Sequence, residues 1–185
     1  MLRPDYPLRT DRLVLRPFEP ADLEDFVAYR LRPDVQRYLY NVAVDKSACA
    51  ELLAKRVNET ELTEEGQRIA LVVQLPEGRV IGDVVLKWLS AQDRQGEIGY
   101  SLNPDHQGRG YASEAAARML RLGFEEFGLH RIVARCDPRN EPSWRLMERL
   151  GMRREAHFRD FGILRGEWGD LYVYAMLAEE YRHNR

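Results

Sequence analysis

Hydrophobic residues follow two different spacings along the chain, and these spacings predict strands and helices in a definite order. Alternation of apolar Leu13 and Leu15 with neighbouring arginines is typical of a half-buried strand over residues 8–18. Over residues 110–127 the apolar side chains instead recur every three or four positions, as on one face of a helix. The same patterns predict strands at residues 8–18, 68–75, 79–89, 96–103, 130–137, 153–163 and 169–177. They predict helices at residues 19–31, 45–60, 110–127 and 140–151.

Turn and cap residues separate these elements and support their boundaries. The sequence PEG between the second and third strands is short enough to close a β-hairpin. Pro104 follows the fourth strand, Gly128 stands where the third helix should stop, and Asn140 can cap the last helix. No repeat, low-complexity tract or linker interrupts the series. We therefore expect one domain over residues 1–185, with an α/β fold in which helices cover a mixed sheet.

The composition narrows the class of protein without naming a reaction. Of 185 residues, 44% are hydrophobic and 31% charged, which excludes a disordered chain and is typical of a soluble globular domain. The 28 basic and 30 acidic residues leave a net charge of -2, which argues against nucleic-acid binding through a basic face. Cys49 and Cys136 are far apart and favour reduced, buried thiols. Without a signal sequence or an apolar run of about 18 residues, we expect a cytoplasmic protein that binds no membrane.

The segment NPDHQGRGYASEA, residues 103–115, places two glycines at the start of the third predicted helix. Glycine disfavours a helix, so Gly108 and Gly110 need another explanation. The start of a helix exposes unpaired N–H groups and a partial positive charge, which suit an anion such as pyrophosphate. Glycines would let the backbone approach the anion closely, and Arg109 would add charge. The alternative is a plain turn in which the glycines supply only unusual dihedral angles.

Two common phosphate-binding motifs do not fit this segment, whereas a third one does. The P-loop pattern is absent, and the dinucleotide pattern G-x-G-x-x-G fails at Ser113. QGRGYA, residues 107–112, instead matches the Q/R-x-x-G-x-G/A loop of the GCN5-related N-acetyltransferases, which the chain resembles over residues 8–177. The opening LRTDRLVLRPFEPADLEDF and the pairing of Asn140 with Ser143 are most similar to the branch containing the ribosomal-protein-alanine N-acetyltransferases.

This resemblance implies a fold, a co-substrate and a reaction. The expected fold is a single α/β domain with a mixed, mostly antiparallel sheet of about seven strands and about four flanking helices. A bulge at residues 100–102, and a splay between that strand and the strand at residues 130–137, would open a slot for a thioester. Acetyl-coenzyme A would be the co-substrate and a primary amine the acceptor, with no metal involved.

The same resemblance assigns residues to the co-substrate. Backbone groups of the fourth strand would hydrogen-bond the pantetheine arm: Tyr100, Ser101 and Leu102. Main-chain N–H groups of the loop would hold the phosphates: Gln107, Gly108, Arg109, Gly110, Tyr111 and Ala112. Asn140 could contact the pantetheine arm, or it could act only as a helix cap.

Acetyl transfer also needs a neutral amine, a polarised carbonyl and a leaving thiolate that can take a proton. Glu97, on the strand that enters the loop, is the first candidate for the general base; the alternative is a glutamate that faces solvent or pairs with an arginine. Other carboxylates near the expected acceptor side are Glu155, Asp160 and Glu167. A backbone N–H near Leu102 could polarise the carbonyl. Met147 stands where many family members have a proton-donating tyrosine, so Ser143 is the candidate for protonating the thiolate.

The acceptor is the part of the reaction on which the sequence is least informative. Three aromatic residues could line its pocket or belong to the core: Tyr38, Tyr40 and Trp168. The four histidines share no metal-ligand spacing. The branch resemblance favours a protein or peptide N-terminus. The alternatives are a small-molecule amine (polyamine, amino acid or antibiotic), a non-catalytic acyl-coenzyme A sensor, which Met147 would suit, and a pure interaction domain. Homodimers are common in the family, but no feature of this sequence fixes the oligomeric state.

Overall fold

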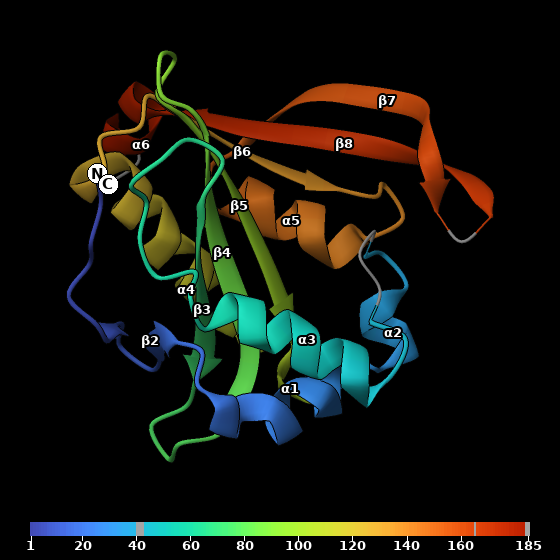
Figure 1. Ribbon diagram of the computed structural model, residues 1–185. Coiled ribbons are helices and arrows are strands. Elements are labelled where there is room, and N and C mark those ends of the chain that lie inside the picture. Colours follow the sequence, from blue (N-terminus) through green and yellow to red (C-terminus); the bar gives the residue numbers. More distant parts are fainter. Residues whose placement is uncertain (40–42, 165, 184–185) are drawn as a thin grey trace.

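The computed structural model describes residues 1–39, 43–164 and 166–183, which form a sheet with helices on both faces (Figure 1). The strands are β1 Leu8–Arg9, β2 Val14–Pro17, β3 Arg68–Gln74, β4 Val80–Ser90, β5 Gln95–Leu102, β6 Arg131–Cys136, β7 Arg153–Leu164 and β8 Glu167–Leu177. The α-helices are α1 Leu23–Arg30, α2 Pro33–Gln36, α3 Lys46–Arg56, α4 Tyr111–Arg121, α5 Glu141–Arg149 and α6 Ala178–His183. Short helical turns lie at Pro20–Asp22, Pro104–His106 and Leu122–Glu126.

The strands lie in the order β1-β2-β3-β4-β5-β6-β8-β7, and every neighbouring pair is antiparallel except β5 and β6. The predicted mixed, mostly antiparallel sheet is confirmed, but it has eight strands. The additional strand arises because residues 8–18 form a hairpin instead of one strand. The chain turns between β1 and β2, where the Leu13 N–H donates to Thr10 Oγ1 at 3.0 Å. The alternation of apolar residues in this segment therefore belongs mainly to β2.

Each face of the sheet carries its own apolar core because alternate residues of a strand point to opposite faces. Val72 of β3 belongs to a cluster with Phe26 of α1 and Leu53 of α3, and these two helices cover the same face in Figure 1. Leu71, the preceding residue of β3, belongs to a second cluster with Met119 of α4. Since β3 is covered on both faces, it reads as a nearly continuous apolar run.

β5 and β6 are neighbours for only part of their length. They form three residue pairs: Gln95–Arg131, Gly96–Ile132 and Glu97–Val133. β5 nevertheless continues to Leu102, and β6 continues to Cys136. The two strands therefore separate beyond the third pair, and the expected splay is confirmed.

The expected bulge at residues 100–102 is wrong. β4 and β5 pair regularly from Gly82–Leu102 to Trp88–Gly96, and their register shifts only at the other end, between Trp88 and Ser90. β6 keeps its pairing with β8 along its whole length. The gap therefore forms because β6 follows β8 away from β5, while β5 stays regular against β4.

The last two strands form a longer ribbon than the sequence predicted. β8 begins at Glu167 rather than at residue 169, and in Figure 1 the β7–β8 ribbon reaches past α5. The short helices α2 and α6 also lie outside the predicted set. Among the residues that the structure describes, no helix is long and apolar enough to cross a membrane.

Close contact between β4 and β5 at the end of the slot depends on Gly82. A Cβ atom at this position would overlap the Ser101 carbonyl oxygen and lie 3.0 Å from Leu102 Cα. Because both obstacles are backbone atoms, we expect Gly82→Ala to lower the free energy of unfolding by about 1–3 kcal/mol. Urea denaturation measures this loss.

Gly99→Ala is the matched control, because Gly99 lies on β5 and its added Cβ would have no atom within 4 Å. We expect its free energy of unfolding to stay within about 0.5 kcal/mol of the wild type. Equal losses in the two variants would contradict the proposed close approach.

Candidate functional site

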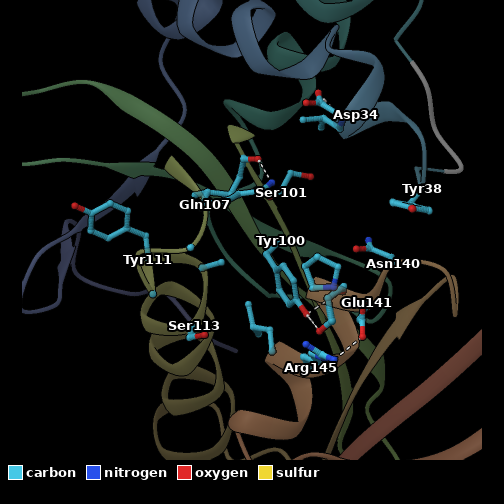
Figure 2. A pocket seen from close by; sticks show the side chains of 18 of the residues that line it. Asp34, Tyr38, Tyr100, Ser101, Gln107, Tyr111, Ser113, Asn140, Glu141 and Arg145 are labelled. Carbon is cyan, nitrogen blue, oxygen red and sulfur yellow. Dashed lines mark hydrogen bonds and ion pairs between the residues drawn. The ribbon is translucent and has the colours of Figure 1, made fainter. Parts of the chain in front are cut away.

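A pocket of about 780 Å³ lies where the end of β5 meets the starts of α4 and α5 (Figure 2). Of the ten residues expected at the co-substrate, nine line this first pocket: Tyr100, Ser101, Leu102, Gln107, Gly108, Gly110, Tyr111, Ala112 and Asn140. Arg109 does not line it. The structure thus brings the strand, the glycine loop and the later helix to one cavity, although these segments are up to 40 residues apart in the sequence.

At its two glycines, the loop between β5 and α4 presents backbone to the first pocket. Gly108 and Gly110 have φ angles of 74° and 83°, a region that side chains other than glycine rarely adopt. Gly110 is the N-cap residue of α4 and offers no side-chain acceptor to the N–H groups of the first turn. Gln107 turns inward, and its Nε2 donates to the Leu102 carbonyl at 3.1 Å. Free N–H groups at a helix start can hold a phosphate or another anion.

An ion pair behind the loop holds it in place. Glu114 of α4 accepts hydrogen bonds from Thr10 Oγ1 at 2.6 Å and from Arg12 Nε at 2.7 Å. Arg12 also donates through Nη1 to the Arg109 carbonyl at 2.9 Å, and its guanidinium lies 4.8 Å from the centre of the Tyr111 ring. Arg12 does not line the first pocket, so it holds this carbonyl from the far side of the loop.

A second pocket of about 370 Å³ lies on the side of the sheet covered by α1 and α3. Five residues line both pockets: Tyr38, Leu39, Tyr100, Ser101 and Ser143. The two cavities therefore meet in the slot between β5 and β6. A long ligand in the first pocket and a separate ligand in the second could contact each other there.

Two carboxylates from neighbouring strands line the second pocket. Glu97 belongs to the last paired position of β5, and its Oε2 lies 3.5 Å from Arg135 Nη1 on β6. Asp83 of β4 is 3% exposed and accepts a hydrogen bond of 2.8 Å from the Tyr29 hydroxyl. Burial, followed by the charge of Asp83, raises the pKa of Tyr29. Sequence reasoning missed Asp83, although a lone acid within the apolar run VIGDVVL was a usable signal.

Two hydroxyl groups meet at the slot between the pockets. The Tyr100 hydroxyl lies 3.1 Å from both the backbone carbonyl and Oγ of Ser143, and Figure 2 shows its ring directed toward the start of α5. Burial raises the pKa of Tyr100, so its phenol stays protonated. Burial likewise raises the pKa of Cys136 to about 11. Met147 is buried in the wall of the second pocket.

Arginines on the core-facing sides of two helices also line the second pocket. Arg30 follows Phe26 by four positions on α1, and Arg56 follows Leu53 by three on α3; all four are buried. Helical spacing places such residues on one face. This spacing from apolar residues is the sequence signal that could have placed both arginines on the core-facing sides of their helices.

Asn140 stands at the N-cap position of α5, but its side chain makes no capping hydrogen bond. Its backbone carbonyl accepts from the Ser143 N–H at 3.0 Å, and its side chain faces the first pocket in Figure 2. The helix start therefore leaves this amide available to a ligand.

The residues expected near the acceptor are only partly at the pockets. Tyr38 lines both pockets, whereas Tyr40 lies outside the described residues. Trp168 is 63% exposed on the ribbon, opposite Ile163, and lines neither pocket; Phe161 from the same ribbon lines the second one. The other candidate carboxylates also line neither pocket: Glu155, Asp160 and Glu167. Within residues 1–39, 43–164 and 166–183, no cluster of His, Cys, Asp and Glu could hold a metal ion.

Known proteins resemble this chain in sequence and in fold. A family model described as the acetyltransferase (GNAT) domain matches residues 12–153. The uncharacterized N-acetyltransferase YnaD of Bacillus subtilis is 35% identical over 174 residues, covering 94% of this chain and 98% of that protein. The ribosomal protein uS5-alanine N-acetyltransferase of Escherichia coli is 31% identical over 88 residues, covering 48% of this chain and 45% of that protein.

A solved structure shares the fold over almost the whole chain. Spermidine N-acetyltransferase from Vibrio cholerae, in complex with CoA and spermine, has a TM-score of 0.79. It is 23% identical, with 94% of this chain and 99% of that chain covered. The names of these three proteins agree on N-acetyl transfer, and the two names that state an acceptor give different ones.

The ion pair behind the glycine loop makes stability depend on pH. Burial alone would raise the pKa of Glu114, but the hydrogen bonds from Thr10 and Arg12 and the charge of Arg12 outweigh it and lower this pKa. A carboxyl with a lowered pKa stabilises the fold above its unfolded-state pKa and loses that contribution as the pH falls through its folded value. We therefore expect the stability gap between wild type and Glu114→Gln to shrink as the pH falls below 4.5.

Urea denaturation from pH 7 down to pH about 3 measures this gap. Glu51→Gln is the control, because Glu51 is an exposed residue of α3. Its stability gap should stay near zero throughout. A gap for Glu114→Gln that is constant with pH would rule out a stabilising role for its charge.

Proposed function

The chain belongs to the GNAT family of acetyltransferases, and from this membership we propose that it acetylates the primary amine at a peptide or protein N-terminus. It is an N-acetyltransferase, and acetyl-coenzyme A is its acetyl donor. The observation that carries the proposal is the slot between β5 and β6, where a pocket with a glycine loop meets a pocket with a carboxylate. YnaD, which aligns with almost the whole chain, supports the choice of reaction. The ribosomal protein uS5-alanine N-acetyltransferase supports the choice of acceptor.

The first pocket would hold the coenzyme through its backbone. Main-chain N–H groups of residues 108–112 would bind the pyrophosphate, because the glycines allow close approach and the helix start favours negative charge. The edge of β5 at Tyr100, Ser101 and Leu102 faces away from β4 and has no partner in β6. Its polar groups would bind the amides of the pantetheine arm as a neighbouring strand would. Asn140 would reach the same arm from α5.

The second pocket would hold the acceptor amine next to the thioester. Glu97 would take a proton from the amine, directly or through a water molecule, so that nitrogen can attack the acetyl carbon. A backbone N–H near Leu102 would stabilise the negative charge that develops on the carbonyl oxygen. The C–N bond then forms and the C–S bond breaks. The coenzyme thiolate leaves and needs a proton.

Ser143 would give that proton and regain one from solvent, and Tyr100 would orient the serine hydroxyl. A phenol has one hydrogen to donate. Tyr100 can donate it to the Ser143 carbonyl or to Ser143 Oγ, both at 3.1 Å. In the second arrangement the serine directs its own hydrogen elsewhere, and the slot is the open side. The raised pKa of Tyr100 keeps this hydrogen in place at neutral pH. The pair would thus replace the hydroxyl that Met147 cannot supply.

Binding of acetyl-coenzyme A at the glycine loop is the first expectation to test. Gly108 has a φ of 74° and open space where a Cβ atom would lie, so Gly108→Ala adds a methyl group to the pocket wall. We expect this variant to weaken acetyl-coenzyme A binding about tenfold or more in isothermal titration calorimetry. The physical cause is loss of the close approach between backbone N–H groups and phosphate.

Gly128→Ala is the matched control. Gly128 has a φ of 77° and equally open surroundings, but it follows the far end of α4. The two variants should therefore lose similar stability, about 1 kcal/mol, while Gly128→Ala binds the coenzyme like the wild type. Equal weakening in both would remove the loop from the binding site. Absence of binding by the wild type would remove both the transferase and the sensor.

Glu97→Gln tests the assignment of the base. The amide cannot accept the amine proton, so we expect kcat to fall about 10²- to 10⁴-fold, with acetyl-coenzyme A binding unchanged. Release of the coenzyme thiol at a saturating peptide concentration measures kcat. Glu155→Gln is the control, because Glu155 is also a strand glutamate paired with an arginine, yet it lines neither pocket. Equal rates in wild type and Glu97→Gln would exclude Glu97 as the base.

A further inference from the structure

Five charged side chains lie among the apolar residues that line the second pocket, on the acceptor side of the slot. Arg30 and Arg56 are 5% and 8% exposed, and both line the cavity. Arg135 adds a third guanidinium, against two carboxylates, Asp83 and Glu97. Buried charges are costly unless they are paired or serve a ligand. The polarity of this pocket therefore bears on what it binds.

Two of the charged side chains on the strands, Arg135 and Glu97, lie beside each other. Arg135 Nη1 lies 3.5 Å from Glu97, so these two side chains largely neutralise one another. Asp83 is held by the Tyr29 hydroxyl at 2.8 Å and is the other carboxylate of the wall. Among the residues that line the pocket, the helix side carries two arginines, Arg30 and Arg56. Glu59, the acidic neighbour of Arg56 at 3.6 Å, lies outside this lining.

Arg56 offers an N–H group that the described residues do not use. Its Nη1 is buried and lies 3.6 Å from Glu59 Oε2, yet it makes no hydrogen bond to any described residue. Arg30 Nη1 lies 3.4 Å from Ser101 Oγ, on the strand beside the slot. A carboxylate in this pocket would supply an acceptor to a desolvated donor, and charge-assisted hydrogen bonds of this kind are among the strongest in proteins.

We infer that the acceptor carries a carboxylate close to its primary amine, and that Arg30 and Arg56 bind this carboxylate. The inference rests on the proposed acetyl transfer and narrows its acceptor. The carboxylate could belong to an acidic residue at a peptide N-terminus or to a free amino acid. A volume of about 370 Å³ is that of a small-ligand site, so amine and carboxylate must lie near each other.

The same charges disfavour a polyamine and assist the reaction. A second ammonium group would face Arg30 and Arg56 at close range, where like charges repel. Positive charge near the acceptor also lowers the pKa of its amine. A larger fraction of the bound amine is then neutral, the form that attacks the thioester.

Turnover of matched acceptors tests the inference in the intact protein with acetyl-coenzyme A. The peptide amides Asp-Ala-Ala and Asn-Ala-Ala differ only in a side-chain carboxylate, and alanine and alaninamide differ only in an α-carboxylate. In at least one pair, we expect kcat/KM to be about tenfold or more higher for the carboxylate, and higher than for spermidine. The pair that responds identifies the source of the carboxylate. Ratios near one in both pairs, or a preference for spermidine, overturn the inference.

Arginine variants then assign the selectivity to the pocket. Arg30→Gln and Arg56→Gln should bring the carboxylate-to-amide ratio toward one, whereas Arg121→Gln, which removes an exposed arginine of α4, should keep the wild-type ratio. Because each ratio is taken within one variant, partial loss of folded protein does not affect it. Arg56→Lys, which keeps the charge, should retain part of the selectivity. An unchanged ratio in both Gln variants overturns the assignment.

Binding without turnover separates this inference from the proposed function. The probes are the acetylated peptides N-acetyl-Asp-Ala-Ala and N-acetyl-Asn-Ala-Ala amide, with N-acetylalanine and its amide, titrated into protein loaded with coenzyme A. Carboxylate-selective binding that Arg56→Gln loses, with no thiol release from any amine, would support the anion site and overturn transfer. Turnover without selectivity in either assay would overturn the anion site and leave transfer standing. If the protein shows no turnover and no selective binding, both the anion site and the proposed transfer are overturned.

Discussion

The separation of β5 from β6 is the constraint on which the site depends. Backbone groups in the middle of a sheet normally pair with the next strand, and leaving them unpaired is costly. Here pairing ends at Glu97–Val133, while β5 stays paired with β4 and β6 with β8. The sheet is therefore held on both sides of the gap. The groups that face the gap remain for a ligand, and the Tyr100 hydroxyl, on β5 beside the gap, bonds to Ser143 of α5.

The two sides of the gap offer different chemical groups to bind negative charge. On the first side the groups are neutral backbone amides at a helix start, exposed on a loop that Arg12 and Glu114 fix from behind. Such a site suits a large, hydrated phosphate group, because little charge has to be buried. On the second side the groups are guanidinium ions that the fold has already desolvated. They suit a small anion that can itself be buried and hydrogen-bonded.

The sequence predicted the parts of this arrangement that depend on local pattern. The strands around Glu97, the glycine loop and the helix after Asn140 all follow from periodicity and turn residues, and the structure joins them in one cavity. The hairpin at residues 8–18 was missed because alternation alone does not mark a tight turn. The exposed position of Trp168 could not be predicted, because it depends on the pairing of β8 with β7, where Trp168 lies opposite Ile163.

The second pocket could not be predicted as a unit, because its charges come from five elements of the chain. Arg30 ends α1, Arg56 ends α3, and the other three lie on strands: Asp83 in β4, Glu97 in β5 and Arg135 in β6. Each one breaks a local rule, since each is a charged residue at a position that the pattern assigns to the core or to a strand interior. One such exception has many structural explanations. Several buried charged residues that line one cavity beside the slot are better explained by a ligand. Apolar residues of similar size would stabilise the fold at least as well, so stability alone does not account for these charges.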